Sequence, residues 1–287
     1  MLYIAIVMYN KKIAEVLSKC TANRLLERHG EDKAHIIIVD NSEGQLNDDE
    51  ESKELIAKHG IVYIHNGKNL GLSKAYNQAL EYALHDSRDP YRDFLMLLDD
   101  DTDVSYPYMH ELYAAYKDAI RIANGVDDNT GFDLEENINV ITGLIESGGR
   151  PMSPIYRFRF SYKEKNCITS PGTYENICCI SSGMAVRLAA LEKVGGFEES
   201  LFLDMIDYTL MYQLSRRRFN NVKVVNAQID QSFSGRQKKP RREVMNRYKI
   251  YCKDFTRFCE ITRRGRLYAS LHLLKRRIML ERSIEKK

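Results

Sequence analysis

Short apolar runs alternate with longer segments of helical periodicity along the first third of the chain. Runs of strand-like length cover residues 2–8, 35–40, 62–65 and 94–98. Between them, apolar residues recur at helical spacing in residues 13–29, 53–59 and 72–84. Strands that alternate with helices in this way form βαβ units. The pattern therefore predicts an α/β fold with a mostly parallel central sheet.

The segment 94–102, FLMLLDDDT, passes directly from five apolar residues to three carboxylates. A continuous apolar run is typical of a central parallel strand, and ligands of open α/β sheets bind beyond the carboxyl ends of such strands. Clustered carboxylates repel one another unless they are solvated or share a cation, and their hard oxygens suit Mg²⁺ or Mn²⁺. We expect Asp99, Asp100 and Asp101 to border a cation site, although a solvated acidic turn would have the same sequence.

Polar residues also follow the other strands that the pattern predicts. Tyr9 and Asn10 follow the first run, Asp40 and Asn41 end the second, and Asn66 and Asn69 follow the third. Each of these residues alone is most often a turn former. Because they recur at every strand end, we expect one shared site at this edge of the sheet.

Composition limits the protein class. With 287 residues, 44% of them hydrophobic, the chain forms one large domain, or one domain with an appendage. The formal charge of +3 gives no reason to expect a nucleic-acid partner. Six cysteines without CxxC spacing favour free thiols in a reducing compartment over zinc sites. No apolar run reaches membrane-spanning length, so we expect a cytoplasmic protein, unless it lies on the inner face of the cell membrane.

A second informative stretch covers residues 180–219. A helix over 188–194 is stopped by Gly195-Gly196, and a second helix is expected to begin near Asp204. On that helix Asp204 and Asp207 would share one face near the N-terminus, where the helix dipole stabilises negative charge. Such a pair is also an ordinary feature of helix starts, so its role stays open from spacing alone.

Four segments, IAIVMYN, IIIVDNSE, NGKNLGLSKAYNQAL and FLMLLDDDT, stand in an order that resembles family 2 glycosyltransferases, and rhamnosyltransferase-like members most. The resemblance implies a GT-A fold and a nucleotide-sugar donor, such as a UDP- or dTDP-sugar, with Mn²⁺ or Mg²⁺ as cofactor. It places the nucleotide base and ribose on the first two segments, and the sugar donor near the third. The corresponding residues are Tyr9, Asn10, Asp40 and Asn41, followed by Asn69, Gly71 and Asn77.

The same resemblance assigns the acidic segment and the 180–219 stretch. Asp99 and Asp101 correspond to the outer carboxylates of a DxD motif, which bind the metal and the diphosphate, and Asp100 lies nearer the ribose. Asp207 corresponds to the catalytic base, with Asp204 one turn earlier. The implied reaction is inverting transfer of rhamnose, galactose or a similar sugar to a hydroxyl of a glycan or lipid-linked acceptor, in cell-surface polysaccharide assembly.

One position departs from the family pattern. Related chains carry a metal-binding histidine where this sequence has Ser232. Either Asp230 or Gln231 assists instead, or Asp101 and the diphosphate hold most of the metal. The departure leaves open whether the metal is required.

The end of the chain is basic. We expect a catalytic domain over residues 1–235 and a helical extension over 236–287. In the extension, apolar residues near helical spacing stand among arginines and lysines, as in a helix that lies on a membrane surface. They are Leu267, Leu271, Leu274, Ile278 and Leu280. A helix packed on the catalytic domain, or on the second subunit of a homodimer, would show the same pattern. Arg236, Lys238 and Lys239 are candidates to reach the donor diphosphate.

Three other functions each predict a feature that the sequence can be compared with. A nicotinamide enzyme would need GxGxxG after the first strand, and no glycine occurs in Val7-Met8-Tyr9-Asn10. An aspartyl phosphotransferase would want threonine or valine two places after Asp101, where Asp103 stands. The absent histidine favours a third alternative, a sugar-nucleotide binding module without activity.

Overall fold

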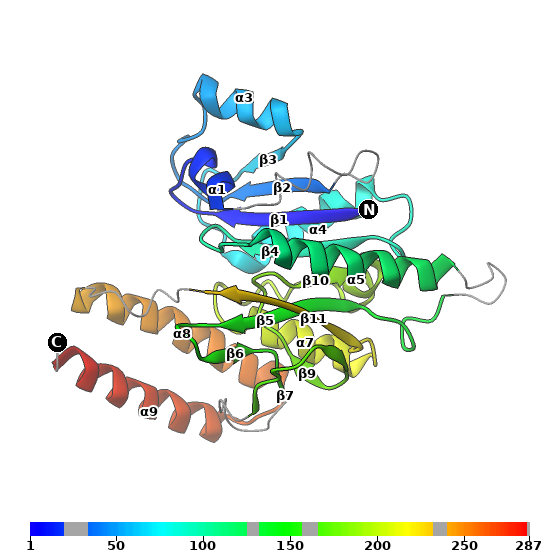
Figure 1. Cartoon of the computed structure of the whole chain (residues 1–287). Coiled ribbons are helices and arrows are strands. Elements are labelled where there is room, and N and C mark those ends of the chain that lie inside the picture. The colour runs from blue at the N-terminus through cyan, green and yellow to red at the C-terminus, as the bar shows by residue number, and fades with distance from the viewer. Residues whose placement is uncertain (20–33, 125–131, 157–165, 232–239, 286–287) are drawn as a thin grey trace.

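The computed structural model describes residues 1–19, 34–124, 132–156, 166–231 and 240–285 (Figure 1). The strands are β1 (Leu2–Met8), β2 (His35–Asp40), β3 (Val62–His65), β4 (Phe94–Asp99), β5 (Val140–Glu146), β6 (Pro151–Ser153), β7 (Ile155–Tyr156), β8 (Gly172–Tyr174), β9 (Ile177–Cys178), β10 (Ala185–Arg187) and β11 (Val222–Asp230). The helices are α1 (Ile13–Lys19), α3 (Glu50–His59), α4 (Leu72–Asp86), α5 (Tyr106–Asn124), α6 (Leu188–Val194), α7 (Ile206–Arg216), α8 (Arg241–Ile261) and α9 (Arg266–Glu285).

A nine-stranded sheet forms the centre of the described chain. Its order is β3-β2-β1-β4-β10-β5-β11-β8, with β6 paired to β5. Neighbouring pairs among the first four strands are parallel, and β10 runs antiparallel to both β4 and β5. It follows that β5 and its parallel partner β11 point in the same direction as β4. The predicted α/β fold with a mostly parallel sheet is confirmed.

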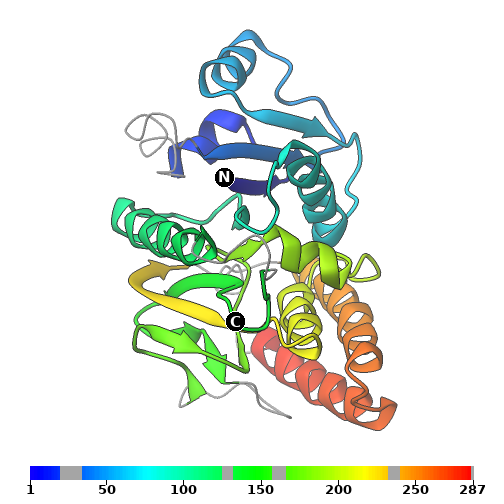
Figure 2. The ribbon, with the colours of Figure 1, turned by 90° about the vertical axis from the view of Figure 1, so that its right-hand side faces the viewer.

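Alternating side chains of the central strands pack into two apolar layers. On one face, Tyr3, Ala5 and Val7 of β1 join buried residues of α4, α6 and α7. On the other, Leu2, Ile4, Ile6 and Met8 join residues of α1 and α5. Figure 2 shows α5 on one side of the sheet and α4, α6 and α7 on the other. Because both faces are covered, the strands are continuous apolar runs, as the sequence predicts for buried parallel strands.

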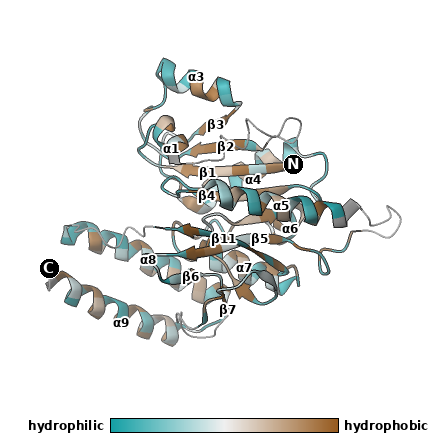
Figure 3. Ribbon diagram, viewed as in Figure 1, coloured by the Kyte–Doolittle hydropathy of each residue, from teal (hydrophilic) through white to brown (hydrophobic). Residues whose placement is uncertain are grey.

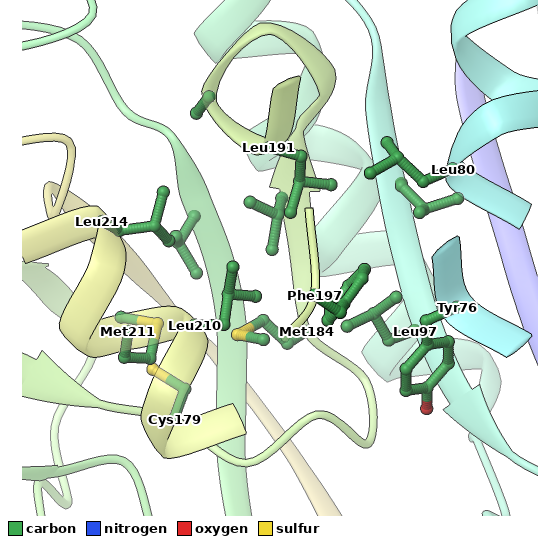
Figure 4. Close-up of a cluster of buried hydrophobic side chains, with 14 of the residues drawn as sticks. Tyr76, Leu80, Leu97, Cys179, Met184, Leu191, Phe197, Leu210, Met211 and Leu214 are labelled. Atoms are coloured by element: carbon green, nitrogen blue, oxygen red, sulfur yellow. The ribbon is translucent and has the colours of Figure 1, made fainter. Parts of the chain in front are cut away.

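The layer around α6 and α7 joins the two halves of the molecule. Figure 4 shows Leu80 and Tyr76 of α4 facing Phe197, Leu191 of α6, and Leu210 of α7 across a common cluster. All of these side chains are buried. The helix that carries Asp207 therefore packs indirectly, through this cluster, against the strands that carry the acidic segment.

Several predicted boundaries differ from the structure. The helix predicted over 13–29 is described as α1 only as far as Lys19, and the remainder lies outside the described residues. The helix expected to begin near Asp204 begins at Ile206, after Met205 in the left-handed region with φ of 64°. None of the five described cysteines forms a disulfide bond.

The C-terminal part of the chain is helical, as predicted, and its two helices form a hairpin. Its two helices, α8 and α9, enclose a separate small apolar cluster that includes Tyr248, Phe255, Phe258 and Ala269. Figure 1 shows the hairpin beside the part of the molecule that contains α7. None of the described helices is both long enough and apolar enough to span a bilayer.

Candidate active site

The polar residues that follow β1, β2 and β4 lie side by side. In the parallel register, Met8 of β1 pairs with Asp40 of β2, and Val7 pairs with Asp99 of β4. The backbone N–H of Asn41 also donates to Met8 O at 2.9 Å. Asp40 and Asp99 therefore flank the carboxyl end of the first strand, which is the arrangement that the alternating pattern predicts for a shared site.

Asp40 is fully buried and well supplied with hydrogen-bond donors. Its carboxylate accepts from Tyr63 OH at 2.6 Å, from Ser42 N at 2.8 Å and from Asn47 Nδ2 at 3.2 Å. Burial, together with the hydrogen bond to Asp40, raises the pKa of the Tyr63 hydroxyl well above its usual range. These bonds fix the Asp40 carboxylate in place at the end of β2.

Asn41 is buried beside it and joins two loops. Its Nδ2 donates to Gly71 O at 3.2 Å, and its Oδ1 accepts from Asn66 Nδ2 at 2.9 Å. Gly71 has φ of 85°, and a Cβ there would meet the ring and carbonyl oxygen of Phe202 at 2.7 and 2.8 Å. Only glycine fits this close approach. Asn69 is exposed and accepts from Gly71 N at 3.0 Å, so it shapes the same turn.

The loop after β1 is tied to the acidic segment. The Tyr9 backbone N–H donates to Asp100 Oδ2 at 3.0 Å, while its exposed side chain extends into solvent. Lys11 Nζ donates to Asp100 Oδ1 at 2.8 Å. Asn10 is exposed with φ of 53°, and its N–H donates to Ser42 Oγ at 2.8 Å. The middle carboxylate therefore holds the loop that carries Tyr9 and Asn10 against β4.

Asp99 is half-buried, as Asp100 is, and two hydroxyl groups donate to its carboxylate. Its Oδ2 accepts from Ser182 Oγ at 2.6 Å, and its Oδ1 accepts from Tyr76 OH at 3.3 Å. Burial, reinforced by the charges of Asp101 and Asp100, raises the pKa of Asp99 despite these hydrogen bonds. The Ser182 turn is fixed beside β4, since Gly183 N donates to Leu97 O at 2.8 Å.

Asp101 is exposed, and among the described residues its carboxylate has no hydrogen-bond or ion-pair partner. Gln231, at the end of β11, is 8% exposed and directs Nε2 toward Ser182 Oγ at 2.8 Å and Asp99 Oδ2 at 3.5 Å. Its Oε1 is buried and has no partner among the described residues. An orphaned buried amide oxygen costs free energy unless a ligand or water satisfies it.

These oxygens fit the expected divalent cation. No group of three or more His, Cys, Asp or Glu side chains in the described part of the chain is arranged to hold a metal. Asp99 and Asp101 would therefore share the ion with Gln231 Oε1, water and substrate oxygens, which is the usual Mg²⁺ or Mn²⁺ arrangement. Asp230, the other alternative to the missing histidine, instead accepts from Gly148 N at 3.1 Å. Ser232, Arg236, Lys238 and Lys239 lie outside the described residues.

Asp207 stands in the first turn of α7, and its Oδ1 accepts from the Tyr208 N–H at 2.8 Å. Burial raises its pKa to about 7, and the negative charges of Asp99 and Asp204 add to the rise. A carboxylate with a pKa near 7 can accept a proton at neutral pH and release it again. Asp207 therefore lies near enough to Asp99 for the two charges to interact.

Asp204 has a different environment from the one predicted. It precedes α7, so it does not form a helical pair with Asp207. Its carboxylate is bound by both terminal nitrogens of Arg247 from α8, with Nη2 to Oδ1 at 2.7 Å. An arginine fork holds a carboxylate by two charge-assisted hydrogen bonds, which fix its orientation. Asp204 therefore ties the loop ahead of Asp207 to α8, and its catalytic role stays a prediction.

Asn77 also serves another purpose than the predicted donor contact. Its Nδ2 donates to Phe197 O at 2.9 Å, and its Oδ1 accepts from Phe197 N at 2.8 Å. Both atoms of the amide are therefore engaged by the turn that follows Gly195-Gly196. This pair of bonds holds α4 against the 196–199 turn, and the donor contact of Asn77 stays a prediction.

Sequence reasoning missed several residues of the site. Asp254 of α8 is 2% exposed and accepts from the backbone N–H groups of Phe202, Leu203 and Asp204 at 3.0, 2.8 and 2.7 Å. Arg247, Tyr76, Ser182 and Lys11 were also not predicted. The Ser-Ser-Gly turn was a sequence signal for Ser182. Asp254 and Arg247 lie in a helix whose sequence indicates only a basic surface.

Solved glycosyltransferase structures share this fold. GalNAc-T7 with UDP, GalNAc and Mn²⁺ matches with a TM-score of 0.60 at 12% identity, over 91% of this chain and 47% of that one. Mannosyltransferase PcManGT from Pyrobaculum calidifontis, in complex with GDP-Man and Mn²⁺, matches with a TM-score of 0.54 at 11% identity. The match covers 95% of this chain and 69% of that one. Residues 1–349 of S. aureus TarS in complex with UDP match with a TM-score of 0.52 at 13% identity, over 89% of this chain and 64% of that one.

The chain spans 47% of the GalNAc-T7 chain and 39% of the longer TarS chain. At these identities the likeness shows the fold, which is GT-A. No curated protein sequence matches the chain significantly. The model of the family described as glycosyl transferase family 2 matches residues 3–193. Because that match covers more than half of the sequence, the chain belongs to glycosyl transferase family 2.

Proposed function

We propose that this protein is an inverting glycosyltransferase that moves a sugar from a nucleoside diphosphate to an acceptor hydroxyl. The observation that carries the proposal is the position of Asp207 in the first turn of α7, near enough to Asp99 at the end of β4 for the two charges to interact. Inverting transfer needs one base, which takes the acceptor's proton, and a stabilised leaving diphosphate. Asp207 suits the first requirement, and the acidic segment suits the second.

The nucleotide is assigned to the ends of β1 and β2. Asp40 and Asn41 are buried and held by hydrogen bonds, whereas the side chains of Tyr9 and Asn10 are exposed next to them. A fixed polar edge beside an exposed aromatic ring suits a base that stacks and forms hydrogen bonds. Asn69 and Gly71 border the same edge, because Gly71 O accepts from Asn41. Solved relatives in the fold bind UDP or GDP-mannose, which supports a nucleotide sugar. We favour a UDP- or dTDP-sugar.

The metal and the diphosphate are assigned to Asp99, Asp101 and Gln231. A bound Mn²⁺ or Mg²⁺ would offset the negative charge that develops on the leaving diphosphate. The exposed Asp101 carboxylate and the orphaned Gln231 Oε1 provide hard oxygen ligands. Asp100, held by Lys11 and the Tyr9 N–H, maintains the shape of the loop beside the ribose.

The chemical step follows from these positions. The acceptor oxygen attacks the anomeric carbon from the side opposite the diphosphate, and its proton passes to a carboxylate oxygen of Asp207. The bond from carbon to the donor's phosphate oxygen breaks, and the nucleoside diphosphate leaves with the bonding electrons. Asp204, Arg247 and Asp254 hold the backbone ahead of Asp207, so that the base is oriented before the acceptor arrives.

The substrates are proposed from the motifs. The rhamnosyltransferase-like order of the four segments favours rhamnose, galactose or a similar hexose as the transferred sugar. The acceptor is a hydroxyl of a glycan or a lipid-linked glycan in cell-surface polysaccharide assembly, and the reaction takes place at the cytoplasmic side of the membrane.

A panel of UDP-, dTDP- and GDP-sugars tests the proposal with Mn²⁺ or Mg²⁺ present. A transferase slowly hydrolyses its donor without an acceptor, so release of one nucleoside diphosphate is expected. Asp207→Asn should bind the same donor and release nothing. A wild-type protein that binds a donor and never turns it over, with or without glycan acceptors, would instead be the inactive binding module.

A further inference from the structure

The outer face of α9 is apolar and uncovered in the described structure. Leu267, Leu271, Leu274 and Ile278 are 76%, 59%, 56% and 41% exposed. Their spacing places all four on one side of the helix, because residues three or four apart are neighbours on a helix surface. Figure 3 shows apolar positions recurring along the length of α9. We call these four side chains the α9 stripe.

The stripe is not part of the packing that holds the hairpin together. A different side of α9 faces α8, where His272 stacks on Phe255 with ring centroids 4.2 Å apart. On that side Tyr248 OH donates to Leu273 O at 2.6 Å, and Arg276 lies 3.7 Å from the Tyr251 ring centroid. The helix is therefore apolar on two sides, and the fold accounts for only one of them.

Basic side chains border the stripe. Residues 263–287 contain nine Lys or Arg and two Glu. Arg266, Lys275 and Arg282 are exposed and have no ion pair among the described residues. On the helix, Lys275 follows Leu271 by four positions, and Arg282 follows Ile278 by four, so both adjoin the stripe. An apolar stripe edged by cations matches a surface with an apolar interior and negative headgroups.

We propose that α9 is a docking surface for anionic lipid bilayers, with the α9 stripe inserted among the acyl chains and the flanking cations on lipid phosphates. A second copy of the chain is the less suitable occupant. A symmetric contact between two stripes would bring the same cations against one another, whereas anionic headgroups neutralise them.

Docking would also orient the active site. The hairpin is fixed to the loop before α7, because Asp254 accepts three backbone N–H groups there and Arg247 binds Asp204. Figure 1 shows the C-terminal end of α9 on the same side as the carboxyl ends of the strands. If the proposed function holds, a bound α9 keeps the acceptor side near the bilayer, where a lipid-linked acceptor would lie.

Vesicle sedimentation of the full chain tests the docking without any sugar substrate. We expect binding to phosphatidylcholine vesicles that contain phosphatidylglycerol, little binding to pure phosphatidylcholine, and release as salt rises. Leu267→Ser with Leu271→Ser should lower the partition coefficient at least about tenfold, because both leucines lose their apolar burial. Lys275→Gln with Arg282→Gln should weaken binding to anionic vesicles and leave the weak binding to neutral ones unchanged.

Matched controls lie in the opposite half of the molecule. Leu46→Ser removes a leucine that is 40% exposed, and Lys58→Gln removes an exposed cation of α3. Both should bind vesicles like the wild type. The melting temperature of each α9 variant checks that the hairpin has folded, and Leu267→Ser alone, at the most exposed position, serves if the double variant is unstable.

Three outcomes would overturn the proposal. Full-length protein that fails to bind anionic vesicles would exclude docking, as would binding that the stripe substitutions leave unchanged. Sedimentation equilibrium gives the other outcome: a wild-type dimer that the leucine substitutions dissociate, together with no vesicle binding, would make the stripe a subunit interface. Because neither measurement needs turnover, a failure here leaves the proposed sugar transfer untouched.

Discussion

The charge of Asp99, at the end of β4, raises the pKa of Asp207, in the first turn of α7. The two carboxylates come from segments that lie far apart in the sequence. Asp99 belongs to β4, which pairs in parallel with β1, and Asp207 belongs to α7. Burial contributes more than this charge to the pKa of about 7. The pKa of Asp207 should therefore fall when a cation neutralises the charge of Asp99.

The first prediction concerns pH. The acid limb of kcat/KM should have an apparent pKa near 7, since Asp207 must be deprotonated to accept the acceptor proton. Saturating Mn²⁺ should move the limb to lower pH, because a cation beside Asp99 offsets the charge that raises the pKa. Asp207→Asn should abolish turnover, whereas Asp204→Asn should lower activity and keep the limb. An unchanged limb in a still active Asp207→Asn variant would remove Asp207 from the mechanism.

The same carboxylate should show itself in stability. Asp207 has a higher pKa in the folded chain, about 7, than the roughly 4 of an unfolded aspartate. Ionisation therefore favours the unfolded state, and the folded protein loses stability as pH rises between these values. Asp207→Asn removes that loss, so its melting temperature should exceed the wild type's at pH 8, and the gain should shrink as pH falls toward 4. Equal melting temperatures at pH 8 would contradict the raised pKa.

A second prediction tests the metal. Asp101→Asn should weaken Mn²⁺-dependent binding of the nucleoside diphosphate by at least about tenfold, because one of two carboxylate ligands loses its charge. Asp103→Asn, an exposed aspartate two places further on, is the matched control and should bind normally. Calorimetric titration of UDP or dTDP, with Mn²⁺ and with EDTA, measures both. Binding that is equal in EDTA would show that Asp101 does not act through a cation.

Gln231 gives a third prediction, because its Nε2 lies 3.5 Å from Asp99 Oδ2 and its Oε1 has no partner among the described residues. Gln231→Leu should reduce the melting-temperature increase that Mn²⁺ produces and raise the KM for the donor. Gln231→Glu should destabilise the metal-free protein through a third negative charge and enlarge the increase with Mn²⁺. Asp230→Asn changes the neighbouring residue, which accepts from Gly148 N, and should leave the metal response unaltered. Equal responses in both Gln231 variants would exclude this amide from the metal site.

The fold was predictable where one physical cause dominates. The runs in β1, β2 and β4 are apolar without alternation because helices cover both faces of the sheet, and that pattern is local in the sequence. The order of β10 and β11 was not predictable. β10 is three residues long and inserts antiparallel between β4 and β5, and no local pattern specifies such a pairing.

The site was predicted best where strand ends determine it. Parallel register alone places Asp40 and Asp99 on either side of the carboxyl end of β1. The hydrogen-bond partners of Asn77 and Asp204 were not predictable, because Phe197 and Arg247 lie in segments that meet these residues only after folding. A side chain's hydrogen-bond partner across a fold has no signature at the side chain's own position. For this reason the sequence did not predict that Arg247 and Asp254 position the loop ahead of Asp207.

The last prediction concerns Asp254, which binds the backbone ahead of the base. Its two oxygens accept from three consecutive N–H groups of the 202–204 loop, and that loop ends at Met205 with φ of 64°. Asp254→Asn replaces one acceptor oxygen by a donor, so at least one buried N–H loses its partner, at about 1–3 kcal/mol of folding stability. The freed loop should also let Asp207 drift, which lowers kcat without changing the affinity for the nucleoside diphosphate.

Glu260→Gln provides the comparison within the same helix. Glu260 is exposed and pairs only with Arg257 on its own helix among the described residues, so its loss should change stability little and turnover not at all. Thermal unfolding, kcat and nucleotide titration separate the two roles of Asp254. A variant that is destabilised but keeps full kcat at a temperature where it is folded would make Asp254 a residue of the fold alone. A fall in kcat at unchanged nucleotide affinity would establish that α8 orients the base.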